Sequence, residues 1–246
     1  MDPDATPIVE AQLDTAAPDP RYREELKAVF WLMYQVRQGS KLPVMEAEAV
    51  AHSLYVSMRT DGPTTLPAIP LHSMSEYVAV HAINVALLAM ALAEFDGVDH
   101  AAVREIGIAG LLHDVGMARV PTELLAKSEQ LSEADRERVR QHPLTGARII
   151  VEADAALELA AVVAYEHHLH VDGTGYPLLR YPRKPHYASQ LVQLCDVYHA
   201  LCSPRPFRQP WPVDLIFSFI NERAGIEFNP ALVTSLLALV KKQSRG

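Results

Sequence analysis

The sequence predicts an all-α protein, and three observations lead to that prediction. Of its 246 residues, 49% are hydrophobic, which is ample for a buried core in one large domain or in one domain with a small helical extension. There are only 11 glycines, and alanine, leucine and valine fill long stretches of the chain. No segment has a strong strand pattern or repeats another. We therefore expect a helical protein whose connections are marked by proline and glycine.

The first 70 residues are expected to form a tail and a helical lead-in. Residues 1–19 are rich in proline and poor in large apolar side chains, a composition typical of a disordered tail. Residues 21–38 have the spacing of an amphipathic helix, with apolar side chains on one face: Leu26, Val29, Phe30, Met33 and Val36. Pro43 suits the first turn of a second helix, over 43–58, and Asp61-Gly62-Pro63 ends it.

Periodicity and helix-breaking residues define the remaining elements. Apolar helices are expected over 75–95 and 101–115, and a shorter helix follows Pro121. Ser132 suits the N-cap of a helix that ends near residue 140, with Asp135 as a weak capping-box partner. His142-Pro143 begins the next helix. The last four helices are expected over 155–168, 188–202, 212–224 and 230–242.

The net charge of −8 argues against a general affinity for nucleic acid or for a membrane surface. Positive charge nevertheless gathers over residues 173–208, where the only acidic residue is Asp196. The five basic residues of this segment are Arg180, Arg183, Lys184, Arg205 and Arg208. This segment is either a site for a small anionic ligand or a solvated loop.

The composition predicts a cytoplasmic protein. Cys195 and Cys202 give no disulfide framework, which suits a reducing compartment. The N-terminus is acidic and contains prolines, unlike a signal peptide. The longest apolar run, around 83–95, is too short to span a bilayer.

Seven side chains spread over several expected helices are candidate metal ligands. They are His81, His113, Asp114, His142, His167, His168 and Asp196. Imidazole and carboxylate together suit first-row divalent metals, although a lone histidine such as His81 is more often an ordinary core residue. Both aspartates lie among apolar neighbours, where an unpaired carboxylate is costly to bury.

The His113-Asp114 pair suggests two metals rather than one. Adjacent residues on a helix point about 100° apart, so these two side chains can face neighbouring ions, with the carboxylate between them. A binuclear centre lowers the pKa of bound water towards about 7 and clamps the oxygens of a phosphoryl displacement. Hydrolysis of a phosphodiester or phosphomonoester therefore fits, with Asp114 and His113 as the catalytic pair.

The ligand order and the segment Asp172-Gly173-Thr174-Gly175-Tyr176-Pro177 resemble the HD-GYP subfamily of the HD metal-dependent phosphohydrolases, over about residues 71–240. The resemblance implies an HD-domain helical bundle over 71–242, an N-terminal helical lead-in over 20–70 and a GYP loop. It also implies a site of two or three metal ions, iron or manganese, and hydrolysis of cyclic di-GMP to pGpG or GMP. The substrate would contact these residues: Gly175, Tyr176, Pro177, Arg205 and Arg208.

Three positions depart from the subfamily pattern by losing a charged group. Met117 stands where a lysine is usual, Leu169 where a glutamate is usual and His199 where an aspartate is frequent. A glutamate that serves a third metal is replaced by Tyr77, which favours two metals. All seven expected ligands nevertheless remain.

These departures leave three interpretations open. The chain is a cyclic dinucleotide phosphodiesterase, a weakened HD-GYP module that binds cyclic di-GMP or a signalling protein, or an HD phosphohydrolase for another nucleotide. In each case we expect no polymeric nucleic acid and no membrane as partner. A homodimer or signalling partner would use the N-terminal helices, where Phe30, Trp31, Met33 and Tyr34 offer apolar surface or simply pack in the core.

Overall fold

The computed structural model describes residues 20–61, 74–125, 130–181, 183–203 and 209–243. These residues form eleven α-helices and no strand, which confirms the predicted all-α class. The expected tail over 1–19, residues 62–73 and the predicted substrate contacts Arg205 and Arg208 lie outside the described residues. In chain order the helices are α1 (Arg23–Arg37), α2 (Val44–Asp61), α3 (Met74–Phe95), α4 (His100–Leu112), α5 (Thr122–Leu125), α6 (Glu133–Val139), α7 (His142–Ala153), α8 (Glu158–Glu166), α9 (Tyr187–Cys202), α10 (Val213–Glu222) and α11 (Pro230–Gln243).

Two expected helices are interrupted by tighter 3₁₀ turns. The helix predicted over 101–115 ends at Leu112, and a 3₁₀ turn, η2, follows over Val115–Arg119. The helix predicted over 155–168 begins with a 3₁₀ turn, η3, over Ala155–Leu157, and α8 ends at Glu166. The ends of α4 and α8 fall beside candidate ligands, where the chain leaves its helix and adjacent side chains can point in different directions. The expected N-cap is confirmed, because the Ser132 hydroxyl accepts from the Asp135 amide at 3.1 Å.

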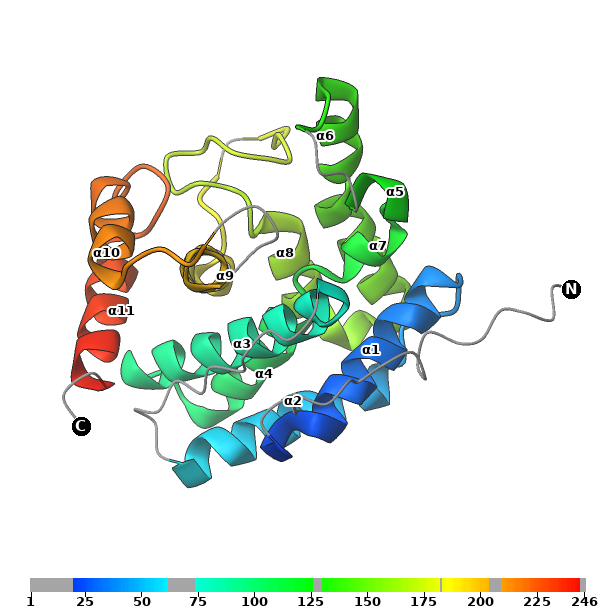
Figure 1. The fold of residues 1–246 in the computed structure, drawn as a ribbon, viewed down its shortest axis with the longest axis horizontal. Coiled ribbons are helices and arrows are strands. Elements are labelled where there is room, and N and C mark those ends of the chain that lie inside the picture. Colours follow the sequence, from blue (N-terminus) through cyan, green and yellow to red (C-terminus); the bar gives the residue numbers. More distant parts are fainter. Residues whose placement is uncertain (1–19, 62–73, 126–129, 182, 204–208, 244–246) are drawn as a thin grey trace, which may run out of the picture.

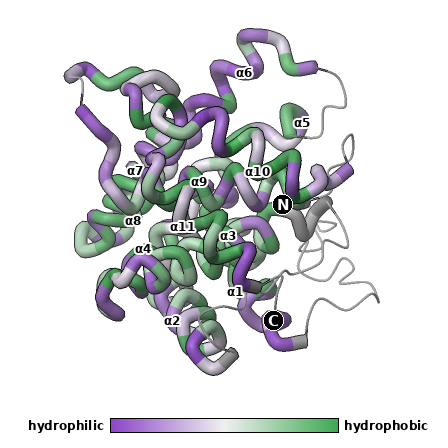
Figure 2. Tube along the Cα trace, turned by 90° about the vertical axis from the view of Figure 1, so that its left-hand side faces the viewer, coloured by the Kyte–Doolittle hydropathy of each residue, from purple (hydrophilic) through white to green (hydrophobic). Residues whose placement is uncertain are grey.

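Helix α3 is the centre of the bundle. It packs mainly against α4 and α9, with α1 and α2 on one side and α11 on the other (Figure 1). Hydrophobic segments gather towards this centre (Figure 2). By length and composition the segment Val78–Phe95 is apolar enough to cross a membrane, although the shorter run seen in the sequence is not. In the fold, 83% of that segment is buried inside the protein, as expected for a core helix.

The lead-in helices α1 and α2 are part of the same core. Their buried side chains include Leu26 and Leu54, which belong to one hydrophobic cluster with α3 and α4. The predicted apolar face of α1 is confirmed at Leu26, Val29 and Val36, whereas Phe30 and Met33 are only partly buried because Leu32 occupies the core side. Polar contacts add to this packing, and the Ser53 hydroxyl donates to the Glu25 carboxylate at 2.5 Å.

If the lead-in belongs to the core, trimming it will destabilise the whole protein. We expect Leu54→Ala to lower the free energy of unfolding by about 2–5 kcal/mol, because Leu54 is fully buried and truncation leaves a cavity. Met45→Ala on the same helix is the control, since Met45 is 80% exposed and should change stability by about 0.5 kcal/mol or less. Urea denaturation followed by circular dichroism measures both. Equal stability of the two variants would contradict this account of the lead-in.

Candidate metal centre

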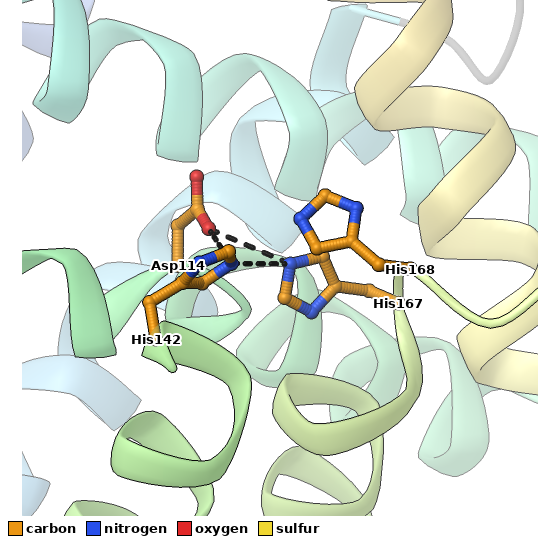
Figure 3. Close-up of side chains that lie close together, drawn as sticks. All are labelled: Asp114, His142, His167 and His168. Carbon is orange, nitrogen blue, oxygen red and sulfur yellow. Dashed lines mark hydrogen bonds and ion pairs between the residues drawn. The ribbon is translucent and has the colours of Figure 1, made fainter. Parts of the chain in front are cut away.

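All seven predicted ligands meet in the structure, in two neighbouring groups. The four-residue group contains Asp114, His142, His167 and His168, and the three-residue group contains His81, His113 and Asp196. In each group the candidate ligand atoms lie within 4.8 Å of one another. Figure 3 shows Asp114 and His142 facing His167, with His168 beside it.

Helix ends supply most of these ligands. His113 caps the C-terminus of α4, His142 is the first residue of α7, and His167 caps α8. His81 and Asp196 instead lie inside α3 and α9. Ends suit this purpose because the backbone can turn within one residue and aim consecutive side chains at different points.

The Asp114 carboxylate lies between the two groups. Its Oδ1 atom is 3.2 Å from His142 Nε2 and 3.5 Å from His167 Nε2, whereas Oδ2 is 3.6 Å from His113 Nε2. Burial alone would raise the pKa of this carboxyl, but His113 and the hydrogen bonds from His142 and His167 hold it well below its usual value. Asp114 is therefore ionised and presents one oxygen to each group, as a bridging ligand does.

Asp196 is the second ionised carboxylate. Its Oδ1 atom lies 3.0 Å from His81 Nε2. Burial again favours the neutral acid, and the hydrogen bond from His81 outweighs it and lowers the pKa of Asp196. Each group thus has a negative charge available for a cation.

Backbone carbonyls orient three of the histidines. The Nδ1 atoms of His113, His142 and His167 lie 2.7, 2.8 and 3.0 Å from the carbonyl oxygens of Gly110, Val139 and Ala164, respectively. A carbonyl oxygen only accepts, so each Nδ1 donates its hydrogen to the backbone, and each Nε2 is left facing the carboxylates, where it can bind a metal once it carries no proton. His113 Nε2 is buried without a hydrogen-bond partner, as expected for a metal ligand. The residues present therefore fit two divalent metals.

Burial also keeps two of the rings in the ligand form. It lowers the pKa of His113, although Asp114 works against it, and it lowers the pKa of His168 further because His167 adds to the effect. His142 behaves differently. Burial lowers its pKa, but the hydrogen bond to Asp114 outweighs that effect and the net shift is upward.

Gly116 allows η2 to approach α7. A Cβ atom at Gly116 would overlap the carbonyl oxygen of His142, so only glycine fits where these two ligand-bearing segments touch. This close approach brings Asp114 and His142 together.

The GYP loop folds back over the four-residue group. Gly175 has a φ of 89°, and a Cβ atom there would overlap the carbonyl of His168. The Tyr176 amide donates to that carbonyl at 3.1 Å, and the Tyr176 ring stacks on His168 with centroids 4.5 Å apart. Burial, with Asp114 and Asp196, raises the pKa of Tyr176, so its phenol stays neutral. Gly175 and Tyr176 thus border the ligand His168, and Pro177 follows them in the chain, while their contact with substrate stays a prediction.

The C-terminal segment supports the outer side of this loop. The amides of Val171 and Asp172 donate to the carbonyls of Glu227 and Ile226 at 3.3 and 3.1 Å. These acceptors lie in the turn between α10 and α11. The position of the loop therefore depends on residues that follow it by about fifty positions in the sequence.

Sequence reasoning missed Glu166, which is completely buried beside the ligand His167. Its carboxylate accepts from the His186 amide at 2.7 Å and from the Ser189 hydroxyl at 2.8 Å, and it pairs with Arg183. Glu166 therefore ties the end of α8 to the start of α9. The sequence did contain a signal for this residue, because an acidic side chain directly before paired histidines in an apolar helix needs a buried partner. Arg183 serves this structural pair, and a cavity of about 330 Å³ beside it contains none of the seven ligands.

The three departures from the subfamily pattern have clear positions. Met117 is partly buried in η2, and its amide donates to the Asp114 carbonyl at 2.8 Å. Leu169 is buried and pairs with Gly175 in an isolated bridge. His199 lies against His81, with 2.8 Å between the two Nδ1 atoms. The guanidinium of Arg119, the nearest cation to Met117 in sequence, lies beside Gly39.

Residues 65–232 match the HD domain family, and the chain belongs to that family. Its relatives support the HD-GYP subfamily that the GYP loop indicated. The chain is 32% identical over 184 residues to "Cyclic di-GMP phosphodiesterase PA4108" of Pseudomonas aeruginosa, which covers 75% of this chain and 44% of that protein. It is 32% identical over 177 residues to a "Cyclic di-GMP phosphodiesterase" of Thermotoga maritima, which covers 70% of this chain and 48% of the relative.

Other relatives differ in their named substrate. The chain is 28% identical over 168 residues to "3'3'-cGAMP-specific phosphodiesterase 2" of Vibrio cholerae, covering 68% of this chain and 32% of that protein. The chain thus spans less than half the length of these curated relatives. The fold resembles that of Bd1817, an HDG"Y"P protein from Bdellovibrio bacteriovorus, with a TM-score of 0.68 at 17% identity, over 89% of this chain and 69% of that one.

The raised pKa of His142 predicts how metal binding varies with pH. A proton stays on this ring up to a higher pH than usual, and a metal must displace it. We therefore expect affinity for Mn²⁺ to rise by about tenfold per pH unit below that pKa and to level off above it. Metal titrations between about pH 5 and pH 8 measure this, with His52→Ala on the exposed side of α2 as control. A pH-independent affinity would contradict the role of His142 as a ligand.

Proposed function

We propose that the protein is a metal-dependent phosphodiesterase that hydrolyses cyclic di-GMP to pGpG or GMP. The observation that carries the proposal is the Asp114 carboxylate, which offers one oxygen to each of two ligand groups. Relatives named as cyclic di-GMP phosphodiesterases support the choice of substrate. We also propose that the protein is cytoplasmic. We further propose that residues 20–70 form a lead-in and residues 71–242 the catalytic domain, and that the two fold as one unit.

The seven residues would hold two divalent ions, and we propose iron or manganese. The four-residue group and the three-residue group would each hold one ion, with Asp114 shared between them. When bound, the metals supply water of lowered pKa and polarise the scissile phosphate. The rigid Nδ1 hydrogen bonds of His113, His142 and His167 fix the ligand geometry before metal arrives.

The remaining residues would place the substrate. In the reaction, water attacks phosphorus, the bond to one ribose oxygen breaks, and that oxygen takes up a proton. We assign the catalytic pair to Asp114, which would serve both metals, and His113, which would hold the metal of the three-residue group. The Tyr176 ring borders the four-residue group and offers a flat, neutral surface for the dinucleotide, with Gly175 and Pro177 beside it. We propose Arg205 and Arg208 as phosphate contacts on the strength of the family motif.

Turnover by the metal-loaded protein tests this function. We expect anaerobically purified protein loaded with Fe²⁺ or Mn²⁺ to release pGpG or GMP from cyclic di-GMP. Asp114→Asn should lower the rate by about 100-fold or more, because both ligand groups lose the shared charge. Asp214→Asn, on the exposed first turn of α10, is the matched control. Chromatography of the products decides the outcome, and 3'3'-cGAMP run in parallel measures preference. Intact substrate at full metal loading would refute the proposal.

One observation favours the second candidate, a catalytically weakened module that binds cyclic di-GMP or a signalling protein. Met117 supplies no charge where the subfamily usually has lysine. Residues three apart in a 3₁₀ turn share a face, and the Met117 amide bonds to the Asp114 carbonyl, so position 117 faces the same side as Asp114. A partner would bind through the N-terminal helices, where Trp31 is 37% exposed on α1.

Restoring the lysine distinguishes the two candidates. We expect Met117→Lys to raise kcat about tenfold or more, since a positioned proton donor is worth about 10²–10⁴-fold. Met117→Gln, of similar size and without charge, is the control. If cyclic di-GMP binds tightly to the native chain and neither variant turns it over, the binding module is the correct function.

A further inference from the structure

His199 occupies a place directly behind the three-residue group. His81 Nε2 points to Asp196, at 3.0 Å, and the opposite ring nitrogen, Nδ1, lies 2.8 Å from His199 Nδ1. His199 Nε2 in turn lies 3.2 Å from the Ser203 hydroxyl. Asp196, His81, His199 and Ser203 therefore form a continuous chain of contacts from α3 to α9 and the residue after it.

The direction of each hydrogen bond follows from the role of His81. If His81 Nε2 binds metal, its hydrogen is on Nδ1 and donates to His199 Nδ1. His199 then carries its own hydrogen on Nε2, and the Ser203 hydroxyl accepts it. Both rings are neutral in this arrangement, and each has one defined tautomer.

This support differs from that of the other histidines. His113, His142 and His167 donate to backbone carbonyls, whereas His81 meets an imidazole that a side-chain substitution can remove. A carboxylate partner would strengthen the hydrogen bond with its charge and make the ligand more basic. A neutral imidazole provides orientation with less of that effect.

We propose that His199 is a positioning residue that orients His81 and sets the affinity of the metal held by His81, His113 and Asp196. The two metals are then unequal. With Asp114 shared, the four-residue group offers three histidines against two and fills first, and the three-residue group fills second with an affinity that depends on His199. The inference rests on the metal centre of the proposed function, but not on its substrate.

Substitutions at position 199 separate orientation from charge. Asn and Asp each carry an oxygen at the place of Nδ1 in the side chain, so His199→Asn keeps a neutral acceptor and His199→Asp adds charge. His199→Ala removes the acceptor. His52→Ala on α2 is the control histidine, exposed and remote in sequence from both groups.

The experiment is a titration of chelator-treated protein with Mn²⁺, read as free Mn²⁺ by electron paramagnetic resonance and as bound metal by elemental analysis. We expect two affinities in the native chain. His199→Ala should weaken the lower one by about 10–100-fold and leave the higher one unchanged. His199→Asn should restore it to within about threefold of native, and His199→Asp should make it tighter than native.

Several results would overturn the inference. The inference is wrong if His199→Ala leaves both Mn²⁺ affinities unchanged, and also if it weakens both by the same factor. If His199→Ala fails to fold, the Asn and Asp variants decide. The inference is overturned if these two variants bind the weaker Mn²⁺ ion with equal affinity. A native chain that binds no Mn²⁺ refutes the metal centre as well, whereas unequal metals without turnover refute only the phosphodiesterase.

Discussion

The fold depends on burying two carboxylates among imidazoles at one point. Asp114 and Asp196 lie in surroundings that favour their neutral forms, yet the adjacent histidines hold both ionised. Removing the imidazoles would leave the carboxylates without hydrogen-bond donors, and removing the carboxylates would leave the imidazoles without acceptors. Both losses cost free energy in an apolar interior. Five helices, α3, α4, α7, α8 and α9, must therefore stop or cross within a few ångströms of the same point. That requirement explains why η2 interrupts the helix predicted over 101–115, and why glycine stands at Gly116.

The arrangement combines rigid and replaceable supports. Backbone carbonyls of α4, the α6–α7 junction and α8 fix three rings without using any side chain, so mutation cannot easily disturb them. Glu166 secures α8 to the start of α9 in the same neighbourhood through buried side-chain contacts. The variable elements are the side chains that stand behind or beside the ligands, among them His199 and Met117. Evolution of a metal centre on this scaffold can therefore alter tuning without altering ligation.

Much of this could be predicted from sequence. Helix positions followed from apolar periodicity and from caps such as Ser132, and the ligand set followed from the cost of burying Asp114 and Asp196 without a partner. The split of the ligands into two groups did not follow, because it depends on how α3 and α9 cross. Nor did the pairing of Arg183 with Glu166, since charge alone cannot tell an anion site from an ion pair with a buried acid. His199 was recognisable as a departure, but its contact with His81 spans 118 positions of sequence and needed the fold.

The two backbone hydrogen bonds from Val171 and Asp172 to the turn before α11 have a consequence for how the molecule can be divided. Every ligand candidate precedes residue 197, so a chain cut after α9 would still carry the full set. It would nevertheless lose the acceptors that hold the outer side of the GYP loop. The chain needed to supply all the ligands is therefore shorter than the chain needed to hold the GYP loop in place. A fragment that binds metal can still lack a properly formed entrance to the metal site.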